Sequence, residues 1–138
     1  MKKILVLCTG NSCRSQMAEG LFKSFDNRLE VYSAGTNPAD IVSPYAIKVM
    51  KEIGLDISNN KLKSIERFLT QDFDYVITVC ENANERCPVF TGKTKNRLHY
   101  GYEDPGHTKG TEDEILEAHR KVRDAMKEEF YKLYKTMK

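Results

Sequence analysis

The sequence predicts an α/β fold in which a four-stranded parallel sheet carries helices on both faces, within a single domain that spans residues 1–138. Short apolar runs alternate along the chain with segments whose apolar residues recur every three or four positions. The run at residues 4–7 is apolar without interruption, as in a parallel strand that is covered on both faces. No repeat, low-complexity tract or linker interrupts the pattern. Strands that alternate with helices favour a parallel sheet with right-handed crossovers.

Four strands are expected, at residues 4–7, 31–32, 75–79 and 98–100. The first and third consist mainly of aliphatic and β-branched residues, which favour strands. The second strand is short, and the fourth has the weakest pattern. In such folds ligands bind beyond the carboxyl ends of the strands, so the residues that follow each strand are candidates for a site.

The expected helices lie between these strands, except the last, which follows the fourth strand. The first begins near residue 15 and presents one apolar face. The second has Pro44 in its first turn, where proline is accepted, and is expected to continue to Gly54. A short helix is expected at residues 65–69. The last begins at a capping box, Thr111 to Glu114, and its apolar residues then step by three and four up to residue 137.

Composition and charge exclude several classes of protein. The net charge of +2 is too small to indicate binding to nucleic acid or to an acidic membrane surface. No apolar stretch approaches the roughly 20 residues that a membrane span needs. The chain begins with lysines and an apolar run, but that run is too short for a signal peptide. We therefore expect a cytoplasmic protein that acts as a monomer.

The four cysteines are Cys8, Cys13, Cys80 and Cys87. A disulfide framework is typical of small secreted scaffolds, which this chain does not resemble in length. A zinc site is not expected either, because neither cysteine pair has the C-x2-C spacing and no H-x3-H accompanies them. Spaced thiols in a reducing compartment are more often catalytic or redox-active.

Cys8 opens a C-x5-R-S loop that joins the first strand to the first helix. Backbone amides of such a loop, together with the amino terminus of the helix, form a nest for an anion. The same field favours the thiolate form of a cysteine, and the guanidinium of Arg14 can bind two oxygens of a tetrahedral anion. The alternative is that Cys8 is a small buried residue at a strand end. The loop predicts an oxyanion site that consists of Thr9, Gly10, Asn11, Ser12, Cys13, Arg14 and Ser15.

Individual loop residues have different expected roles. Gly10 permits a turn that a side chain would obstruct. Ser15 is positioned to donate a hydrogen bond to the Cys8 sulfur, whereas Cys13 is expected to point away from the anion and to be structural. Cys80 and Asp104 also follow predicted strands, which places them at the same edge of the sheet as Cys8.

The sequence resembles the thioredoxin-coupled arsenate reductases, which have the low-molecular-weight protein tyrosine phosphatase fold with its flavodoxin-like winding. The resemblance rests first on LCTGNSCRSQMAEG at residues 7–20. It extends over most of the chain, through VYSAG at 31–35, DISN at 56–59, VC at 79–80, CP at 87–88, EDP at 103–105 and VRD at 122–124.

This resemblance implies a role for each of five side chains in arsenic detoxification. Cys8 attacks arsenate that is held by the loop amides and Arg14, and Asp104 acts as general acid. Cys80 then attacks the Cys8 sulfur and expels arsenite, and Cys87 moves the disulfide to the Cys80–Cys87 pair. Thioredoxin reduces that disulfide. Phosphate and sulfate are expected to compete with arsenate.

Two other functions remain open from the residues. One is a low-molecular-weight tyrosine phosphatase in which Cys80 and Cys87 form a redox lock. The other is a phosphocarrier, although Arg14 and Asp104 argue against it. The chemistry favours the reductase, because a second thiol can reduce sulfur-bound arsenic(V) but not phosphorus(V). The continuation after Asp104, Gly106-His107-Thr108, also lacks aromatic residues and so favours a small inorganic substrate.

Many of the thioredoxin-coupled arsenate reductases that the sequence resembles hold a potassium ion near the anion loop. Asn11, Glu19 and Ser33 match positions of that site, but Lys63 stands where an aspartate would complete it. We therefore do not expect potassium, another metal or a tightly bound cofactor. The hypothesis is that the Lys63 ammonium takes the place of the ion, and the alternative is a solvated surface lysine.

Overall fold

The computed structural model describes residues 2–81 and 89–137. Its sheet contains β1 (Lys3–Cys8), β2 (Glu30–Gly35), β3 (Phe73–Thr78) and β4 (Thr94–His99) in the order β2-β1-β3-β4. All three strand pairs are parallel, as predicted. β1 lies inside the sheet, with β2 on one side and β3 and then β4 on the other, which is the strand order expected of a flavodoxin-like fold.

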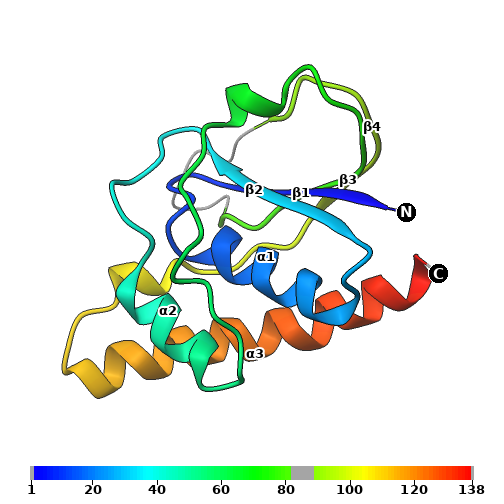
Figure 1. Cartoon of the computed structure of the whole chain (residues 1–138). Helices are drawn as coiled ribbons and strands as arrows, with labels where there is room; N and C mark the ends of the chain where they lie inside the picture. The colour runs from blue at the N-terminus through cyan, green and yellow to red at the C-terminus, as the bar shows by residue number, and fades with distance from the viewer. Residues whose placement is uncertain (1, 82–88, 138) are drawn as a thin grey trace.

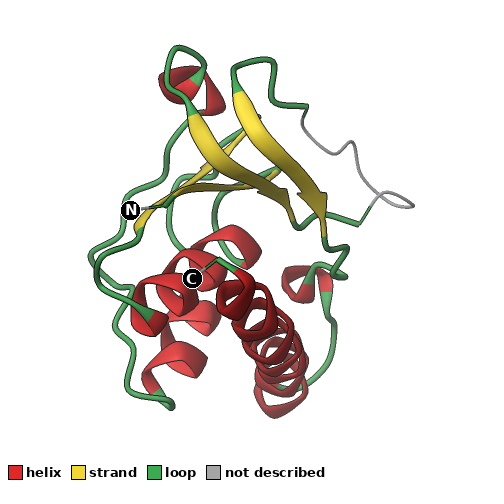
Figure 2. Ribbon diagram, turned by 90° about the vertical axis from the view of Figure 1, so that its right-hand side faces the viewer, coloured by secondary structure: helices red, strands yellow, loops and turns green. Residues whose placement is uncertain are grey.

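The α-helices α1 (Arg14–Phe25), α2 (Pro44–Lys51) and α3 (Glu112–Thr136) lie together on one face of the sheet (Figure 1). The opposite face carries the short 3-10 helix η1 (Ile65–Phe68), as Figure 2 shows above the strands. A second 3-10 helix, η2 (Pro105–His107), follows β4. The prediction of helices on both faces is confirmed, with the longer helices gathered on one side.

Alternate side chains of β1 fill two separate cores. Ile4 and Val6 are fully buried with residues of the three α-helices. Leu5 and Leu7 are fully buried on the other face, in a cluster that includes Phe68 of η1. Burial on both sides explains why this strand is apolar throughout. The sheet therefore holds the carboxyl end of β1 rigidly in the middle of the molecule.

The local signals for helix ends operate as expected. Pro44 begins α2, and the Ser43 hydroxyl before it accepts a hydrogen bond from the backbone of Ala46. Both halves of the predicted capping box are formed at the start of α3, where Thr111 and Glu114 bond reciprocally. The end of α2 was predicted too late, because the helix stops at Lys51 and Gly54, with φ of +80°, lies in the turn that follows.

Two strands were predicted too short. β2 extends over residues 30–35, and β4 begins at Thr94 rather than at residue 98. β4 is an edge strand whose side chains are mostly exposed, so its first four residues are polar. Only the end of β4, from Leu98, has the apolar character by which a strand is recognised in the sequence.

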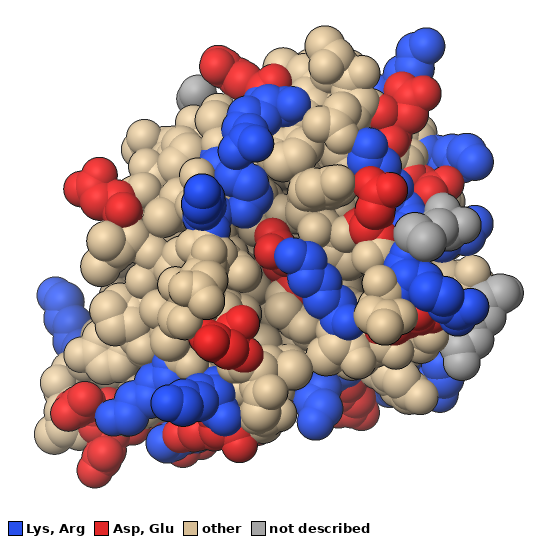
Figure 3. Space-filling view, in the orientation of Figure 1, with Lys and Arg blue, Asp and Glu red and all other residues tan. Residues whose placement is uncertain are grey.

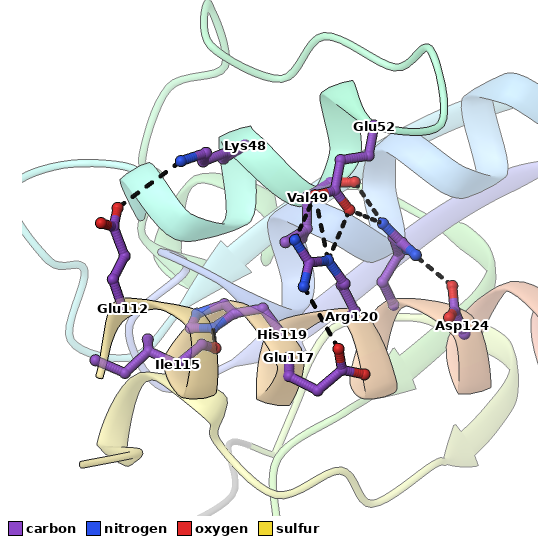
Figure 4. A network of polar contacts seen from close by, with 10 residues as sticks. Lys48, Val49, Glu52, Glu112, Ile115, Glu117, His119, Arg120 and Asp124 are labelled. Carbon is purple, nitrogen blue, oxygen red and sulfur yellow. Dashed lines mark hydrogen bonds and ion pairs between the residues drawn. The ribbon is translucent and has the colours of Figure 1, made fainter. Parts of the chain in front are cut away.

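Helices α2 and α3 are held together by the polar network in Figure 4. The Glu52 carboxylate accepts hydrogen bonds from Arg120, with Nη2 at 2.8 Å, and from Arg123 Nη1, also at 2.8 Å. Arg123 is buried and donates in addition to the carbonyl oxygen of Val49 at 2.8 Å. These contacts hold the carboxyl end of α2 and the residue after it, Glu52, against the middle of α3.

Acidic and basic side chains are interspersed over the face in Figure 3, in keeping with the net charge of +2. Among the helices of the described residues, none combines the length and apolar character required to cross a bilayer.

Candidate active site

Cys8 lies at the carboxyl end of β1, and the loop from residue 9 to residue 13 turns from it into α1. The loop carbonyls of Thr9, Gly10 and Ser12 accept hydrogen bonds from the neighbouring segment, from the N–H groups of Asn37, Ala39 and Ser43 at 2.8–3.0 Å. Because C=O and N–H point in opposite directions across a trans peptide, the next amides are turned the other way. The N–H of Asn11 accordingly lies 3.3 Å from the Cys8 sulfur.

The Cys8 thiol is 2 % exposed and has a second polar neighbour. The hydroxyl oxygen of Ser15 lies 2.9 Å from the sulfur, as expected from the sequence. Two groups that can donate a hydrogen bond thus lie beside the sulfur, and the start of α1 adds a positive field. The geometry therefore suits a nucleophile.

Arg14 and Asp104 meet beside this loop. Arg14 is 3 % exposed; its Nη1 donates to the carbonyl oxygen of Tyr102 at 2.9 Å, and its Nη2 lies 3.6 Å from Oδ2 of Asp104. The other carboxylate oxygen of Asp104 accepts from the N–H of Gly106 at 2.8 Å. His107 extends into solvent, with Nε2 3.5 Å from Asp104. The Asp104 carboxylate is thus oriented by η2 and lies next to the Arg14 guanidinium.

A cavity of about 460 Å³ opens at this point. Its walls include Cys8, Arg14 and Asp104, together with loop residues Gly10, Ser12 and Cys13. Residues of the segment before α2 complete it, among them Ile41 and Tyr45, which no motif in the sequence had indicated. The cavity is large enough for a tetrahedral anion.

Cys13 borders the cavity but is a poor nucleophile. The residue is 7 % exposed, and burial raises the pKa of its thiol strongly, with a further contribution from the Asp104 carboxylate. The thiol therefore remains protonated at neutral pH. That Cys13 has a structural rather than a chemical role, and points away from a bound anion, stays a prediction.

A buried polar network supports the loop from below. Asn11 adopts the left-handed conformation, with φ of +52°, and its amide nitrogen donates to the hydroxyls of Ser15 and Ser33, each at 2.9 Å. Ser33 donates in turn to Glu19 Oε1 at 2.7 Å. Gln16, which the sequence did not single out, donates to the Asn11 side-chain oxygen at 3.1 Å. These bonds link the Cys8 environment to the Glu19 carboxylate.

Lys63 closes this network. Its backbone N–H donates to Asn11 Oδ1 at 2.9 Å, and its ammonium group lies 3.7 Å from Glu19 Oε1 and 2.6 Å from the carbonyl oxygen of Lys61. The side chain is only 12 % exposed. Burial lowers the pKa of Lys63, against the opposing effect of the Glu19 carboxylate. The structure thus brings together the supporting residues that the sequence had grouped, and Lys63 is not a solvated surface lysine.

Cys80 is fully buried two residues after β3. The N–H of Val79, directly before it, donates to the carbonyl of Leu7, directly before Cys8, at 2.9 Å. The two cysteines therefore follow adjacent strands at the same edge of the sheet. Cys80 takes part in a disulfide, whereas Cys8 and Cys13 are free thiols. The predicted third redox cysteine, Cys87, lies outside the described residues.

Over residues 2–81 and 89–137, no group of three or more His, Cys, Asp or Glu side chains could hold a metal ion.

The sequence of this chain is similar to a known family and to characterised relatives. Residues 3–138 match the family model described as low molecular weight phosphotyrosine protein phosphatase. The arsenate reductase of Halalkalibacterium halodurans is 48% identical over 124 residues, which are 89% of this chain and 88% of that protein.

Solved structures give the same result. The structure titled "An arsenate reductase in the phosphate binding state" aligns with this chain over 100% of both chains, with 34% identity and a TM-score of 0.84. The thioredoxin-dependent arsenate reductase Cg_ArsC1' of Corynebacterium glutamicum has 25% identity and a TM-score of 0.64, and covers 99% of this chain and 63% of its own. The chain therefore belongs to the low molecular weight phosphotyrosine protein phosphatase family, in the part of it that contains arsenate reductases.

Proposed function

We propose that this protein reduces arsenate to arsenite through a relay of three cysteines, and that thioredoxin regenerates it. The observation that carries the proposal is the placement of Cys8 in an anion loop beside Arg14 and Asp104, with a second redox-capable cysteine, Cys80, at the end of the adjacent strand. A hydrolytic phosphatase needs the loop and the acid but not the second thiol.

In the first step the loop amides and Arg14 hold the arsenate oxygens, and the Cys8 thiolate attacks arsenic. Asp104 donates a proton to the departing oxygen, which leaves as water. The product is a sulfur–arsenic(V) bond at Cys8. Thr9, Gly10, Asn11, Ser12 and Cys13 contribute backbone rather than side-chain chemistry, so the site distinguishes anions mainly by shape and charge. Phosphate and sulfate therefore compete for it.

In the second step the Cys80 thiolate attacks the Cys8 sulfur. The sulfur–arsenic bond breaks, its electron pair stays on arsenic, and arsenite leaves while a Cys8–Cys80 disulfide forms. Cys87 then attacks Cys80, which releases Cys8 as a thiolate. The structure holds Cys8 free and Cys80 in a disulfide, and this distribution is consistent with the end of the relay.

Thioredoxin is proposed as reductant because a relative of this family is a thioredoxin-dependent arsenate reductase. The exchange requires a dithiol that attacks the disulfide and leaves oxidised, which restores two thiols for each arsenate reduced. Reduced thiols of this kind persist in the cytoplasm, where we place the protein as a monomer.

The Lys63 ammonium is proposed to support the loop in place of a metal cation. Its ammonium group lies near Glu19 Oε1, the carboxylate oxygen that also accepts from Ser33, and Ser33 in turn accepts from Asn11. The function therefore needs neither potassium nor another tightly bound cofactor.

The second candidate is a tyrosine phosphatase whose Cys80 and Cys87 form a redox lock. The description of the matching family, low molecular weight phosphotyrosine protein phosphatase, favours it. It predicts that Cys80→Ser and Cys87→Ser variants retain full hydrolysis of aryl phosphates.

The test is arsenate-dependent NADPH oxidation with thioredoxin and thioredoxin reductase. We expect turnover in the wild type, at most one arsenite per protein in Cys87→Ser, and none in Cys8→Ser. Absence of arsenate-dependent turnover in the wild type, together with rapid hydrolysis of an aryl phosphate, would establish the phosphatase instead.

A further inference from the structure

The segment between β4 and Asp104 is anchored at Tyr102, a residue without an assigned role. The N–H of Tyr102 donates to the carbonyl of Val79 at 3.2 Å, directly before Cys80. Its own carbonyl accepts from Arg14 Nη1 at 2.9 Å, and its hydroxyl donates to Glu129 Oε1 of α3 at 2.6 Å. One residue thus connects the end of β3, the anion-binding arginine and the longest helix.

Arg14 depends on this anchor for its orientation. The guanidinium is buried, and the Tyr102 carbonyl holds Nη1 while Nη2 approaches Asp104. Asp104 is only two residues beyond Tyr102 in the same segment. A shift of Tyr102 would therefore displace the arginine and the acid together, and misplacement by about 1 Å can lower a rate roughly 10²-fold.

The Tyr102 hydroxyl is well suited to fix the segment. Burial raises the pKa of this phenol strongly and the Glu129 carboxylate adds to the effect, so the hydroxyl stays protonated and donates. A hydrogen bond to a charged acceptor is stronger than a neutral one. The ring also packs edge to face on Phe130, with centroids 6.0 Å apart. Glu129 and Phe130 are neighbours on α3, so this helix holds both ends of the side chain.

We infer that Tyr102 and Glu129 form a positioning pair that sets Arg14 and Asp104 for oxyanion binding and proton transfer. The inference rests on the proposed function for its link to arsenate, but its effect on anion binding is independent of reduction. Tyr102 is not among the residues that line the cavity, and it acts through Arg14 and through the segment that carries Asp104.

Tyr102→Phe tests the pair because it removes one oxygen and keeps the ring and all backbone bonds. We expect the Kd for inorganic phosphate, measured by titration calorimetry, to rise at least fivefold. In the arsenate assay we expect kcat to fall at least as much, with a smaller change in KM. Glu129→Gln retains an acceptor oxygen for the phenol and should recover most of the binding, whereas Glu129→Ala should match Tyr102→Phe.

Tyr100→Phe is the matched control. Its ring packs on the same Phe130, with centroids 5.3 Å apart, but its hydroxyl makes no hydrogen bond within the part of the chain that the structure describes. This variant should bind phosphate like the wild type.

A lower thermal midpoint of Tyr102→Phe with unchanged phosphate Kd and kcat would overturn the inference and leave only a structural bond. Equal effects of Tyr100→Phe and Tyr102→Phe on phosphate binding would also overturn it. Phosphate binding that weakens in Tyr102→Phe alone would support the pair, even if the wild type fails to reduce arsenate. In that case the reductase proposal fails and the positioning pair stands.

Discussion

The hydroxyl oxygen of Ser15 lies 2.9 Å from the sulfur of Cys8, and Asn11 approaches both groups. The Ser15 oxygen accepts a hydrogen bond from the side-chain amide of Asn11, so the hydroxyl hydrogen of Ser15 can be donated to the Cys8 sulfur. The contact connects Cys8 to the buried polar network beneath the loop. Its consequences can be measured without any assay of reduction.

Ser15→Ala should slow alkylation of Cys8 by iodoacetamide at pH 7 by about tenfold. A hydrogen bond to a charged group contributes roughly 1.5–3 kcal/mol, and its loss disfavours the thiolate. Peptide mass spectrometry can follow Cys8 alone. Ser24→Ala is the control, because Ser24 also lies in α1 but donates to the Leu21 carbonyl, away from the site. An equal alkylation rate in wild type and Ser15→Ala would contradict the prediction.

Lys63→Met should destabilise the protein and reduce its arsenate turnover. The substitution keeps an unbranched apolar side chain of similar volume but leaves Glu19, which is 4 % exposed, with one cationic partner fewer. We expect the free energy of unfolding to fall by about 1–3 kcal/mol, as for a buried polar group that loses a partner. Urea denaturation measures this change.

Lys23→Met provides the comparison, because Lys23 also contacts Glu19, at 2.8 Å, but its side chain is 51 % exposed. We expect it to change the stability by less than about 0.5 kcal/mol. Turnover of the wild type should be equal in potassium and sodium salts. Strong and specific activation by potassium would argue against the ammonium as a substitute for the ion.

Glu52→Gln should lower the thermal midpoint at pH 7 by weakening the contact between α2 and α3. Hydrogen bonds from Arg120 and Arg123 lower the pKa of Glu52 from its ordinary 4.5 to about 2. A lowered carboxyl pKa gives stability above pH 4.5 that is lost as the pH falls toward 2. The difference between wild type and variant should therefore shrink over that interval.

A pH series of thermal midpoints measures the Glu52 effect. Glu117→Gln is the control, since Glu117 approaches the same Arg120 at 3.4 Å with a more exposed side chain. A Glu52→Gln effect that is constant from pH 7 to pH 3 would mean that the ion pairs do not cause it.

His119→Phe should make the stability less sensitive to mild acid. His119 is fully buried, its Nδ1 lies 2.7 Å from the Ile115 carbonyl, and its Nε2 has no partner within the described residues. Burial lowers the pKa of His119 below its ordinary 6.5, although the Ile115 carbonyl and the Asp104 charge oppose this. The unfolded chain thus takes up the proton more readily, so stability is lost as the pH falls below 6.5.

Phenylalanine keeps an aromatic ring against Tyr45, whose centroid lies 5.4 Å from that of His119. The thermal midpoint of the variant should fall less between pH 7 and pH 5 than that of the wild type. Parallel pH curves for the two proteins would show that His119 does not contribute to the acid sensitivity.

Local patterns in the sequence determined much of the fold and the centre of the site. The apolar run of β1 specified a strand covered on both faces, and the capping box specified the start of α3. Cys8 and Arg14 could be placed together from the sequence because a loop of five residues separates the end of β1 from the start of α1. Such features depend on neighbours along the chain, and residue types therefore reveal them.

Only the tertiary structure decided which distant groups meet. Arg14 and Tyr102 are 88 residues apart, and their contact involves a backbone carbonyl, which every residue possesses and no motif can mark. The burial of Lys63 against Glu19 likewise required the chain after β2 to return beside α1. β4 could not be delimited because an edge strand exposes polar side chains and has no apolar period. Contacts of this kind follow from how the strands and helices pack, a property of the whole chain that no local pattern contains.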